Sequence, residues 1–327
     1  MHPFALHPVL VERPWGGRRL DRYGKRIPEG LMIGESWEVA DLPDHVAPHV
    51  GDPRSRVATG PLTGAALSDL IADSREELLG PVRPTDEGRF PLLVKLLDAR
   101  EHLSVQVHPH EQYVEEHPEA RLKTESWYVM EAEPDAELFL DVADGVARQD
   151  VVDVLGTPAV ASLLRSVPAT AGAFHHVPAG LIHALGSGVM VAEIQTPSDT
   201  TFRIYDWADE YGRSPRHLHA KESAASILIH PPAAFSSEPD PDTPTRRLIE
   251  TQYYWITEHR ATGGTVRLAP DPGPRVIMVI SGWATIGDIE AGSGSTVIIP
   301  ASAMPCRVEA FEDAVLLEVG IPVERRP

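Results

Sequence analysis

Polar side chains alternate with apolar ones in the segment SVQVHPHE, residues 104–111. A strand places residues i and i+2 on the same face, so Gln106 and His108 would project together into one cavity. Pro109 would then end the strand, because proline has no amide hydrogen to donate. A strand with one solvated polar face would show the same alternation, so this motif alone does not establish a site.

Two later segments supply side chains with similar chemistry. Lys123 and Glu125 share one face of the segment KTESWYVM, and His183 follows a Pro-Gly turn among apolar neighbours. A hydrogen-bonded core histidine would explain His183 taken alone. Two imidazoles, one carboxylate and one amide oxygen are nevertheless available from four residues: Gln106, His108, Glu125 and His183. This set suits Zn²⁺ at a catalytic site, and its oxygen donors leave Mn²⁺, Fe²⁺ or Co²⁺ as alternatives.

The elements that must position these donors are short. Thirty-one Pro and 25 Gly punctuate the chain, and runs rich in β-branched and aromatic residues lie between them. We expect strands at 34–40, 91–97, 103–107, 125–130, 189–195, 201–206, 276–280 and 295–299. The helical spacing i, i+3, i+4 predicts helices at 65–79, 150–164 and 215–227. The sequence therefore predicts a mainly β, largely antiparallel protein with a few accessory helices.

A segment rich in Pro, Ser and Asp, residues 229–245, predicts a connection between two domains. We expect a catalytic metal-binding domain with helical insertions at 1–235 and a smaller β domain at 245–327. Short strands separated by Gly turns in the second domain are typical of a small jelly roll. Residues 261–327 contain no histidine, so we expect no metal site there.

Charge and composition exclude several classes of function. Lys and Arg number 29 against 48 Asp and Glu, a formal net charge of −19, which repels nucleic acids and anionic membrane surfaces. We therefore expect no nucleic-acid and no membrane partner. No apolar stretch of about 18 residues occurs, and the single Cys306 cannot form an internal disulfide, so we expect a cytoplasmic protein. The oligomeric state, monomer or dimer, stays open.

Six motifs occur in order over roughly two hundred residues: PWGG at 14–17, GESWEVA at 34–40, PLLVKLLDAREHLSVQVHPHE at 91–111, KTESWYV at 123–129, VPAGLIHALGSG at 177–188 and EIQTPSDTTFRIYDW at 193–207. In this order they resemble the type I mannose-6-phosphate isomerases of the cupin superfamily, in their short bacterial form. The resemblance implies two cupin-like jelly-roll barrels. It also implies an aldose-ketose isomerase that interconverts mannose 6-phosphate and fructose 6-phosphate through an enediol.

The resemblance also implies roles for individual residues. The zinc ligands are Gln106, His108, Glu125 and His183. The catalytic residues are Arg203, Lys123, Glu193 and Asp199, with Arg203 stabilising charge and the other three as candidates for the proton-transfer base. The substrate phosphate is bound by Lys95 and Ser104. His110 stands where the family more often has Asn or Asp.

Other interpretations of the same residues stay open. Arg203 could form a structural ion pair with Asp199, Asp206 or Glu193, and Lys95 could be a strand lysine whose stem packs on apolar neighbours. A cupin that binds a sugar without catalysis is one alternative function. Another metal-dependent cupin enzyme, an epimerase or a dioxygenase, is a second, because one fold can serve several chemistries.

Overall fold

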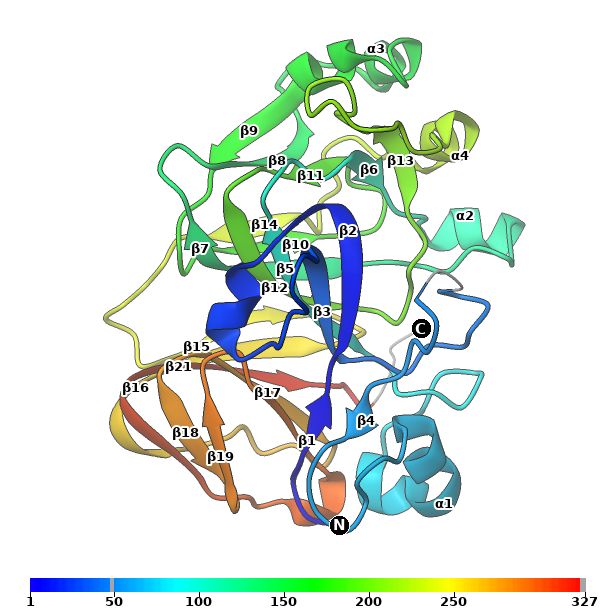
Figure 1. The fold of residues 1–327 in the computed structure, drawn as a ribbon. Coiled ribbons are helices and arrows are strands. Elements are labelled where there is room, and N and C mark those ends of the chain that lie inside the picture. The colour runs from blue at the N-terminus through cyan, green and yellow to red at the C-terminus, as the bar shows by residue number, and fades with distance from the viewer. Residues whose placement is uncertain (48–49, 324–327) are drawn as a thin grey trace.

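The computed structural model describes residues 1–47 and 50–323, which form three antiparallel sheets (Figure 1). In Figure 1 a five-stranded sheet lies at the top, a seven-stranded sheet lies in the middle and a nine-stranded sheet lies below them. The expected mainly β fold with few helices is confirmed. No helix in the described part of the chain is long and apolar enough to cross a membrane.

The upper two sheets face each other. The seven-stranded sheet has the order β14 (Phe235–Ser237), β10 (Phe174–Val177), β7 (Glu125–Ala132), β12 (Val189–Gln195), β5 (Leu93–Ala99), β2 (Val9–Gly17) and β3 (Ile33–Val39). The five-stranded sheet has the order β13 (Phe202–Tyr205), β6 (Val105–Val107), β11 (His183–Leu185), β8 (Glu137–Val142) and β9 (Leu164–Pro168). Trp15, Leu97 and Trp127 of the first sheet pack with Leu138 and Leu185 of the second, so an apolar core joins the two inner faces.

The other face of the seven-stranded sheet packs on the nine-stranded sheet. The latter contains β15 (Thr245–Glu250), β16 (Trp255–Val266), β21 (Val308–Gly320), β17 (Arg275–Ser281), β20 (Thr296–Ile299), β1 (Phe4–His7), β4 (Arg56–Val57), β18 (Trp283–Ile286) and β19 (Ile289–Gly292). Val94 and Met190 share a core cluster with Ile256 and Met278 of this sheet. All seven residues of β12 are buried, because the sheet that contains them is covered on both faces.

The division into domains at 1–235 and 245–327 stays a prediction. Two strands, β1 and β14, show how the chain crosses between the sheets of the two expected domains. Strand β1 pairs with β20, so the start of the chain lies in the C-terminal sheet. Strand β14, inside the expected connection at 229–245, pairs with β10 at the edge of the seven-stranded sheet. The connection is therefore partly ordered as a strand.

The described residues form four α-helices: α1 (Leu67–Leu79), α2 (Glu111–Glu116), α3 (Arg148–Asp153) and α4 (Ala220–Ser226). The predicted helix at 150–164 is wrong. Helix α3 ends at Asp153, Gly156 adopts a φ of 81°, and a separate 3₁₀ helix begins at Pro158. A left-handed glycine and a proline without an amide hydrogen break the apolar periodicity that suggested one helix.

Candidate metal centre and substrate pocket

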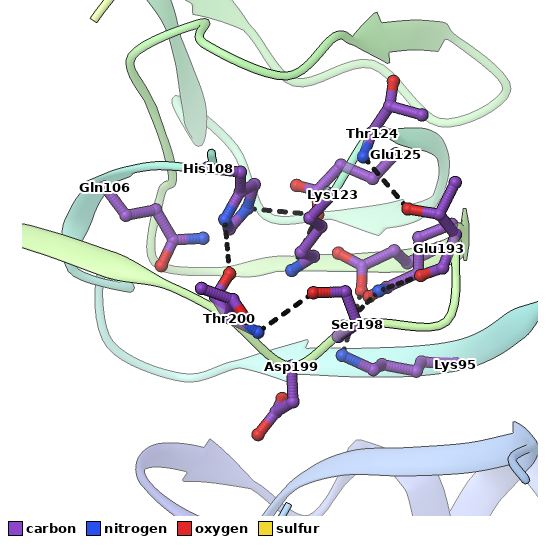
Figure 2. A network of polar contacts seen from close by, with 12 residues as sticks. Lys95, Gln106, His108, Lys123, Thr124, Glu125, Glu193, Ser198, Asp199 and Thr200 are labelled. Atoms are coloured by element: carbon purple, nitrogen blue, oxygen red, sulfur yellow. Dashed lines mark hydrogen bonds and ion pairs between the residues drawn. The ribbon is translucent and has the colours of Figure 1, made fainter. Parts of the chain in front are cut away.

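The four predicted metal ligands meet between the two upper sheets. His183 on β11 lies directly opposite Gln106 on β6, so the ladder places their side chains together. His108 follows β6, and its Nε2 lies 3.3 Å from Oε2 of Glu125, the first residue of β7. His183 Nε2 lies 3.4 Å from Glu125 Oε1. Figure 2 shows Gln106, His108 and Glu125 converging from different segments, and the three ionisable donors offer ligand atoms within 4.8 Å of one another.

The donor atoms of this centre fit a divalent cation. His183 Nδ1 lies 2.8 Å from the carbonyl oxygen of Leu181, and His108 Nδ1 lies 3.1 Å from that of Thr200. A carbonyl oxygen only accepts, so each Nδ1 carries the hydrogen and each Nε2 keeps a lone pair. His108 Nε2 and both carboxylate oxygens of Glu125 are buried without a hydrogen-bond partner in the described part of the chain. Buried lone pairs that point at one another are costly unless a cation binds them.

Burial and charge hold these groups in their ligating forms. Burial, and then the nearby ammonium of Lys123, lower the pKa of His108 to about 3, which keeps the imidazole neutral. Burial opposes ionisation of Glu125, but Lys123 and His108 hold the pKa of this carboxyl well below its ordinary value. Lys123 Nζ lies 2.9 Å from Glu125 Oε2. Burial favours the neutral amine of Lys123, yet the carboxylates of Glu125 and Glu193 raise its pKa overall.

A second charged cluster lines the seven-stranded sheet beside the donors. Lys95 on β5 lies directly opposite Glu193 on β12. Lys95 Nζ is 3.3 Å from Glu193 Oε1 and 3.5 Å from Glu35 Oε2. Trp127 donates its indole N–H to Glu193 Oε2 at 3.0 Å, and Arg13 donates Nε–H to Glu35 Oε1 at 2.5 Å. Burial, and then the charge of Glu125, raise the pKa of Glu193.

Both clusters border a cavity of about 180 Å³. Seven of the predicted site residues line it: Lys95, Ser104, Gln106, Lys123, Glu193, Asp199 and Arg203. The remaining three, His108, Glu125 and His183, are fully buried beside it. The structure therefore brings all ten predicted residues together. A larger cavity of about 970 Å³, between the N-terminal segment and the β18–β19 hairpin, contains none of them.

Arg203 occupies the five-stranded side of this cavity. It lies opposite Gln106 in the ladder between β13 and β6, and its Nη1 donates to the carbonyl of His217 at 2.9 Å. Its Nε lies 3.9 Å from Asp206 Oδ1, and this Nε has no hydrogen-bond partner in the described ranges. Burial, and then the charge of Arg216, lower the pKa of Arg203 to about 10.

Three charged residues at the cavity were not predicted: Arg13, Glu35 and Arg216. Glu35 and Arg13 belong to segments whose motifs are visible, GESWEVA and ERPWGG, and charged residues beside buried tryptophans were the available signal. Arg216 lies in an irregular segment with no such signal. His110 caps α2: its Nδ1 accepts a hydrogen bond from the amide of Tyr113 at 3.3 Å.

The chain is similar in sequence to known proteins over most of its length. Residues 4–143 match the family described as phosphomannose isomerase type I, catalytic domain. The chain is 37% identical over 234 residues to the mannose-6-phosphate isomerase of Streptococcus mutans, covering 71% of this chain and 69% of that protein. It is 35% identical over 267 residues to the mannose-6-phosphate isomerase ManA of Bacillus subtilis, covering 80% of each.

Solved structures share the fold over nearly the whole chain. The crystal structure of mannose 6-phosphate isomerase from Bacillus subtilis superposes with a TM-score of 0.82 at 29% identity, covering 98% of this chain and 100% of that one. A mannose 6-phosphate isomerase bound with zinc and yttrium has the same fold, with a TM-score of 0.73 at 16% identity and coverage of 98% and 100%. The order of the motifs, the paired sheets and these relatives lead to one assignment. The chain belongs to the type I mannose-6-phosphate isomerase family.

Proposed function

We propose that this protein is a metal-dependent aldose-ketose isomerase that interconverts mannose 6-phosphate and fructose 6-phosphate through an enediol. One observation carries the proposal. Two neutral imidazoles and a carboxylate, those of His108, His183 and Glu125, offer buried ligand atoms within 4.8 Å of one another beside a small polar cavity, and the atoms of His108 and Glu125 have no hydrogen-bond partner among the described residues. The identities of the relatives as mannose-6-phosphate isomerases support the substrate.

Zn²⁺ is the ion we propose for this centre, with Gln106 as the fourth ligand. Two imidazoles with carboxylate and amide oxygen are donors that Zn²⁺ accepts while a position stays open. Gln106 Nε2 lies 3.2 Å from His183 Nε2, and a half-turn of the amide would present its oxygen at this place instead. When bound, the ion would act as a Lewis acid that stabilises negative charge on the O1 and O2 oxygens of the sugar.

Proton transfer requires a base beside C1 and C2. In the forward direction the base takes the proton from C2 of the aldose and returns it to C1, while a hydroxyl proton moves from O2 to O1. We assign this role to Glu193, with Lys123 and Asp199 as alternatives. Its Oε2 is held by the indole of Trp127, its Oε1 accepts no hydrogen bond from a described residue, and the side chain borders the cavity. Burial also raises its pKa toward the range useful for a base.

Glu193→Gln tests the assignment of the base, because glutamine keeps the shape and an acceptor for Trp127. We expect kcat to fall by about 10² to 10⁴-fold with metal content unchanged. The measurement is exchange of the C2 hydrogen with solvent deuterium together with kcat. Full exchange in the Glu193→Gln protein, with its loss in Lys123→Met or Asp199→Asn, would assign the base to that other residue.

Arg203 and the phosphate contacts complete the proposed site. Arg203, next to Gln106 in the ladder, would stabilise the charge that develops on the enediol oxygens. Ser104 and Lys95 would contact the phosphate, and Lys95→Ala should therefore raise KM for mannose 6-phosphate. The charge of Lys95 is already shared with Glu35 and Glu193, so a phosphate dianion needs further cations.

A coupled assay separates this function from its alternatives. Formation of fructose 6-phosphate from mannose 6-phosphate is the expected result. Sugar binding without turnover would indicate a non-catalytic cupin. Formation of glucose 6-phosphate without fructose 6-phosphate would indicate an epimerase. Metal-dependent oxygen consumption would indicate a dioxygenase.

We also propose that the chain has two domains with different roles. Residues 1–235 would carry the metal centre and 245–327 would be a cupin-like β domain without one. The only group of metal-ligand side chains in the described ranges, His108, Glu125 and His183, supports this division. Because a phosphorylated sugar is a metabolite of the cell interior, we propose that the protein acts in the cytoplasm.

A further inference from the structure

Three guanidinium groups line the cavity, and they come from three separate segments. Arg13 lies on β2, Arg203 lies on β13, and Arg216 lies in the segment between β13 and α4. Arg203 is the one beside the metal donors, because it faces Gln106 across the ladder. In Figure 2 Asp199 points away from His108, toward the N-terminal strands, and Arg13 Nη2 lies 3.8 Å from Asp199 Oδ1. Arg13 thus lies at the part of the cavity away from the metal centre.

Positive charge is concentrated on the five-stranded side of the cavity. Arg216 Nε donates to Asp206 Oδ1 at 2.8 Å, and Arg213 Nη1 donates to Asp206 Oδ2 at 3.2 Å. Arg203 Nε is 3.9 Å from the same carboxylate. One carboxylate thus serves three guanidinium groups, of which Arg213 also reaches Glu101 at 3.2 Å.

The positive charges of Arg203, Arg216 and Arg13 repel one another inside a partly desolvated cavity. Arg216 and Arg13 both disfavour the cationic form of Arg203, and Arg203 Nε is buried without a hydrogen-bond partner in the described chain. Like charges held close together in such an environment are relieved by an anion. On the opposite wall, Lys95 lies between two carboxylates and carries little unshared charge.

We propose that Arg13 and Arg216, which line the same cavity as Arg203, form a clamp for the 6-phosphate of the substrate and so make the enzyme require a phosphorylated sugar. The inference rests on the proposed function and adds two residues to its substrate site. A guanidinium offers paired N–H groups that match phosphate oxygens. With the reacting carbons beside the metal centre and Arg203, the far end of a six-carbon sugar phosphate faces the two remaining arginines.

Ion pairs hold both arginines in place before substrate arrives. Glu35 accepts from Arg13 and Asp206 accepts from Arg216, so little side-chain freedom would be lost on binding. A purely structural role would rest on the same ion pairs. A phosphate clamp and a structural ion pair differ in one respect: only in the clamp does removal of each arginine weaken the affinity for phosphate.

The test uses the full-length, zinc-loaded protein and its Arg13→Ala, Arg216→Ala, Arg13→Lys and Arg216→Lys variants. Arg213→Ala is the matched control, because Arg213 binds the same Asp206 but is not among the residues that line the cavity. Inorganic phosphate is titrated by calorimetry, and KM and kcat are measured with mannose 6-phosphate. Thermal melting of every variant reports the structural contribution of each ion pair.

We expect each alanine variant to weaken phosphate binding and raise KM by about 10- to 100-fold, the range for lost hydrogen bonds to a charged group. We expect kcat to change by less than about threefold, because the phosphate contact is remote from C1 and C2. The phosphate affinity and KM of the lysine variants should lie between those of the wild type and the alanine variants, since lysine keeps the charge but loses the paired N–H geometry. Arg213→Ala should keep phosphate affinity and KM even where its melting temperature falls.

Unchanged phosphate affinity in both alanine variants would overturn the clamp, whatever happens to their melting temperatures. So would equal losses in Arg216→Ala and Arg213→Ala, or no phosphate binding by the wild-type protein. If Arg13→Ala does not fold, Arg13→Lys and the Arg216 variants decide. Arginine-dependent phosphate binding without turnover of mannose 6-phosphate would refute the isomerase and leave the clamp standing, whereas turnover with arginine-independent phosphate binding would do the reverse.

Discussion

Two buried charged clusters in this molecule use similar residues to opposite effect. In the C-terminal sheet, Arg275 and Glu318 are fully buried, and Arg275 Nε donates to Glu318 Oε1 at 2.9 Å. His259 Nε2 lies 2.9 Å from Glu318 Oε2, and its Nδ1 lies 3.2 Å from Thr245 Oγ1. The other N–H groups of Arg275 donate to backbone carbonyls, among them those of Gly273 and Ala269, and to Asp271 Oδ1 at 3.3 Å.

The cluster between the upper sheets is equally buried but incompletely paired. Among the described residues, polar atoms of His108, Glu125, Glu193 and Arg203 have no hydrogen-bond partner. Leaving such atoms unpaired is costly, whereas a fully paired cluster holds its neighbours in one arrangement. The comparison indicates that the C-terminal cluster stabilises the fold and that the inter-sheet cluster keeps its bonding capacity for a cation and a substrate.

The largest difference in metal content and turnover between the two clusters should come from replacing a histidine in each by alanine. His108→Ala or His183→Ala should lose bound metal and about 10³-fold or more of turnover, because each removes an imidazole ligand. His259→Ala, the matched change in the C-terminal cluster, should keep metal and turnover while its melting temperature falls. Metal content, kcat and thermal melting on the same preparations check this. A His108→Ala protein with full metal would make the ligand assignment wrong.

The two arginines extend the comparison to catalysis. Arg203→Ala should keep metal and nearly all thermal stability while kcat falls by about 10² to 10³-fold, the range for one preorganised donor. Arg275→Ala leaves Glu318 buried without its guanidinium partner and should lose about 3–5 kcal/mol of unfolding free energy, with kcat per folded molecule unchanged.

Denaturant unfolding and kcat, measured on both variants, distinguish the catalytic role of Arg203 from the structural role of Arg275. The contrary pattern, a strongly destabilised Arg203→Ala protein with normal kcat, would make Arg203 a structural partner of Asp206.

A smaller effect concerns a buried histidine that, unlike His259, has no carboxylate beside it among the described residues. His175 on β10 contacts Ser236 Oγ at 2.8 Å, and burial lowers its pKa to about 4. Between pH about 6.5 and about 4 the unfolded chain binds a proton that the folded protein does not, so stability falls as the pH falls through this window. This histidine should account for about 3 kcal/mol of that loss.

His175→Gln should flatten the stability profile by that amount, as measured by denaturant unfolding at pH 7 and pH 4. An unchanged difference between the two pH values would assign the acid sensitivity to other groups.

The sequence predicts the parts of this account that depend on local pattern. The alternation of polar and apolar residues predicted that Gln106 and His108 share one face of a strand. The order of the motifs, through the family resemblance, predicted that Glu125, His183 and Arg203 belong to the same site. Pairings between distant segments leave no such pattern. The pairing of β1 with β20 and the contact of Arg13 with Glu35 arise only when the sheets form.

The surroundings of Lys95 show the same limit. As a single cation in an apolar run it is a natural candidate for phosphate binding. Its two carboxylate neighbours come from β3 and β12, 60 residues before it and 98 residues after it, which no local spacing reveals.

The central claim is that the inter-sheet donors hold a divalent ion on which isomerisation depends. Metal analysis of the purified protein, combined with turnover of mannose 6-phosphate before chelation, after chelation and after addition of Zn²⁺, tests it most directly. We expect about one metal ion per chain, loss of fructose 6-phosphate formation on chelation and its return with Zn²⁺. Undiminished turnover by a protein shown to be free of metal would contradict it.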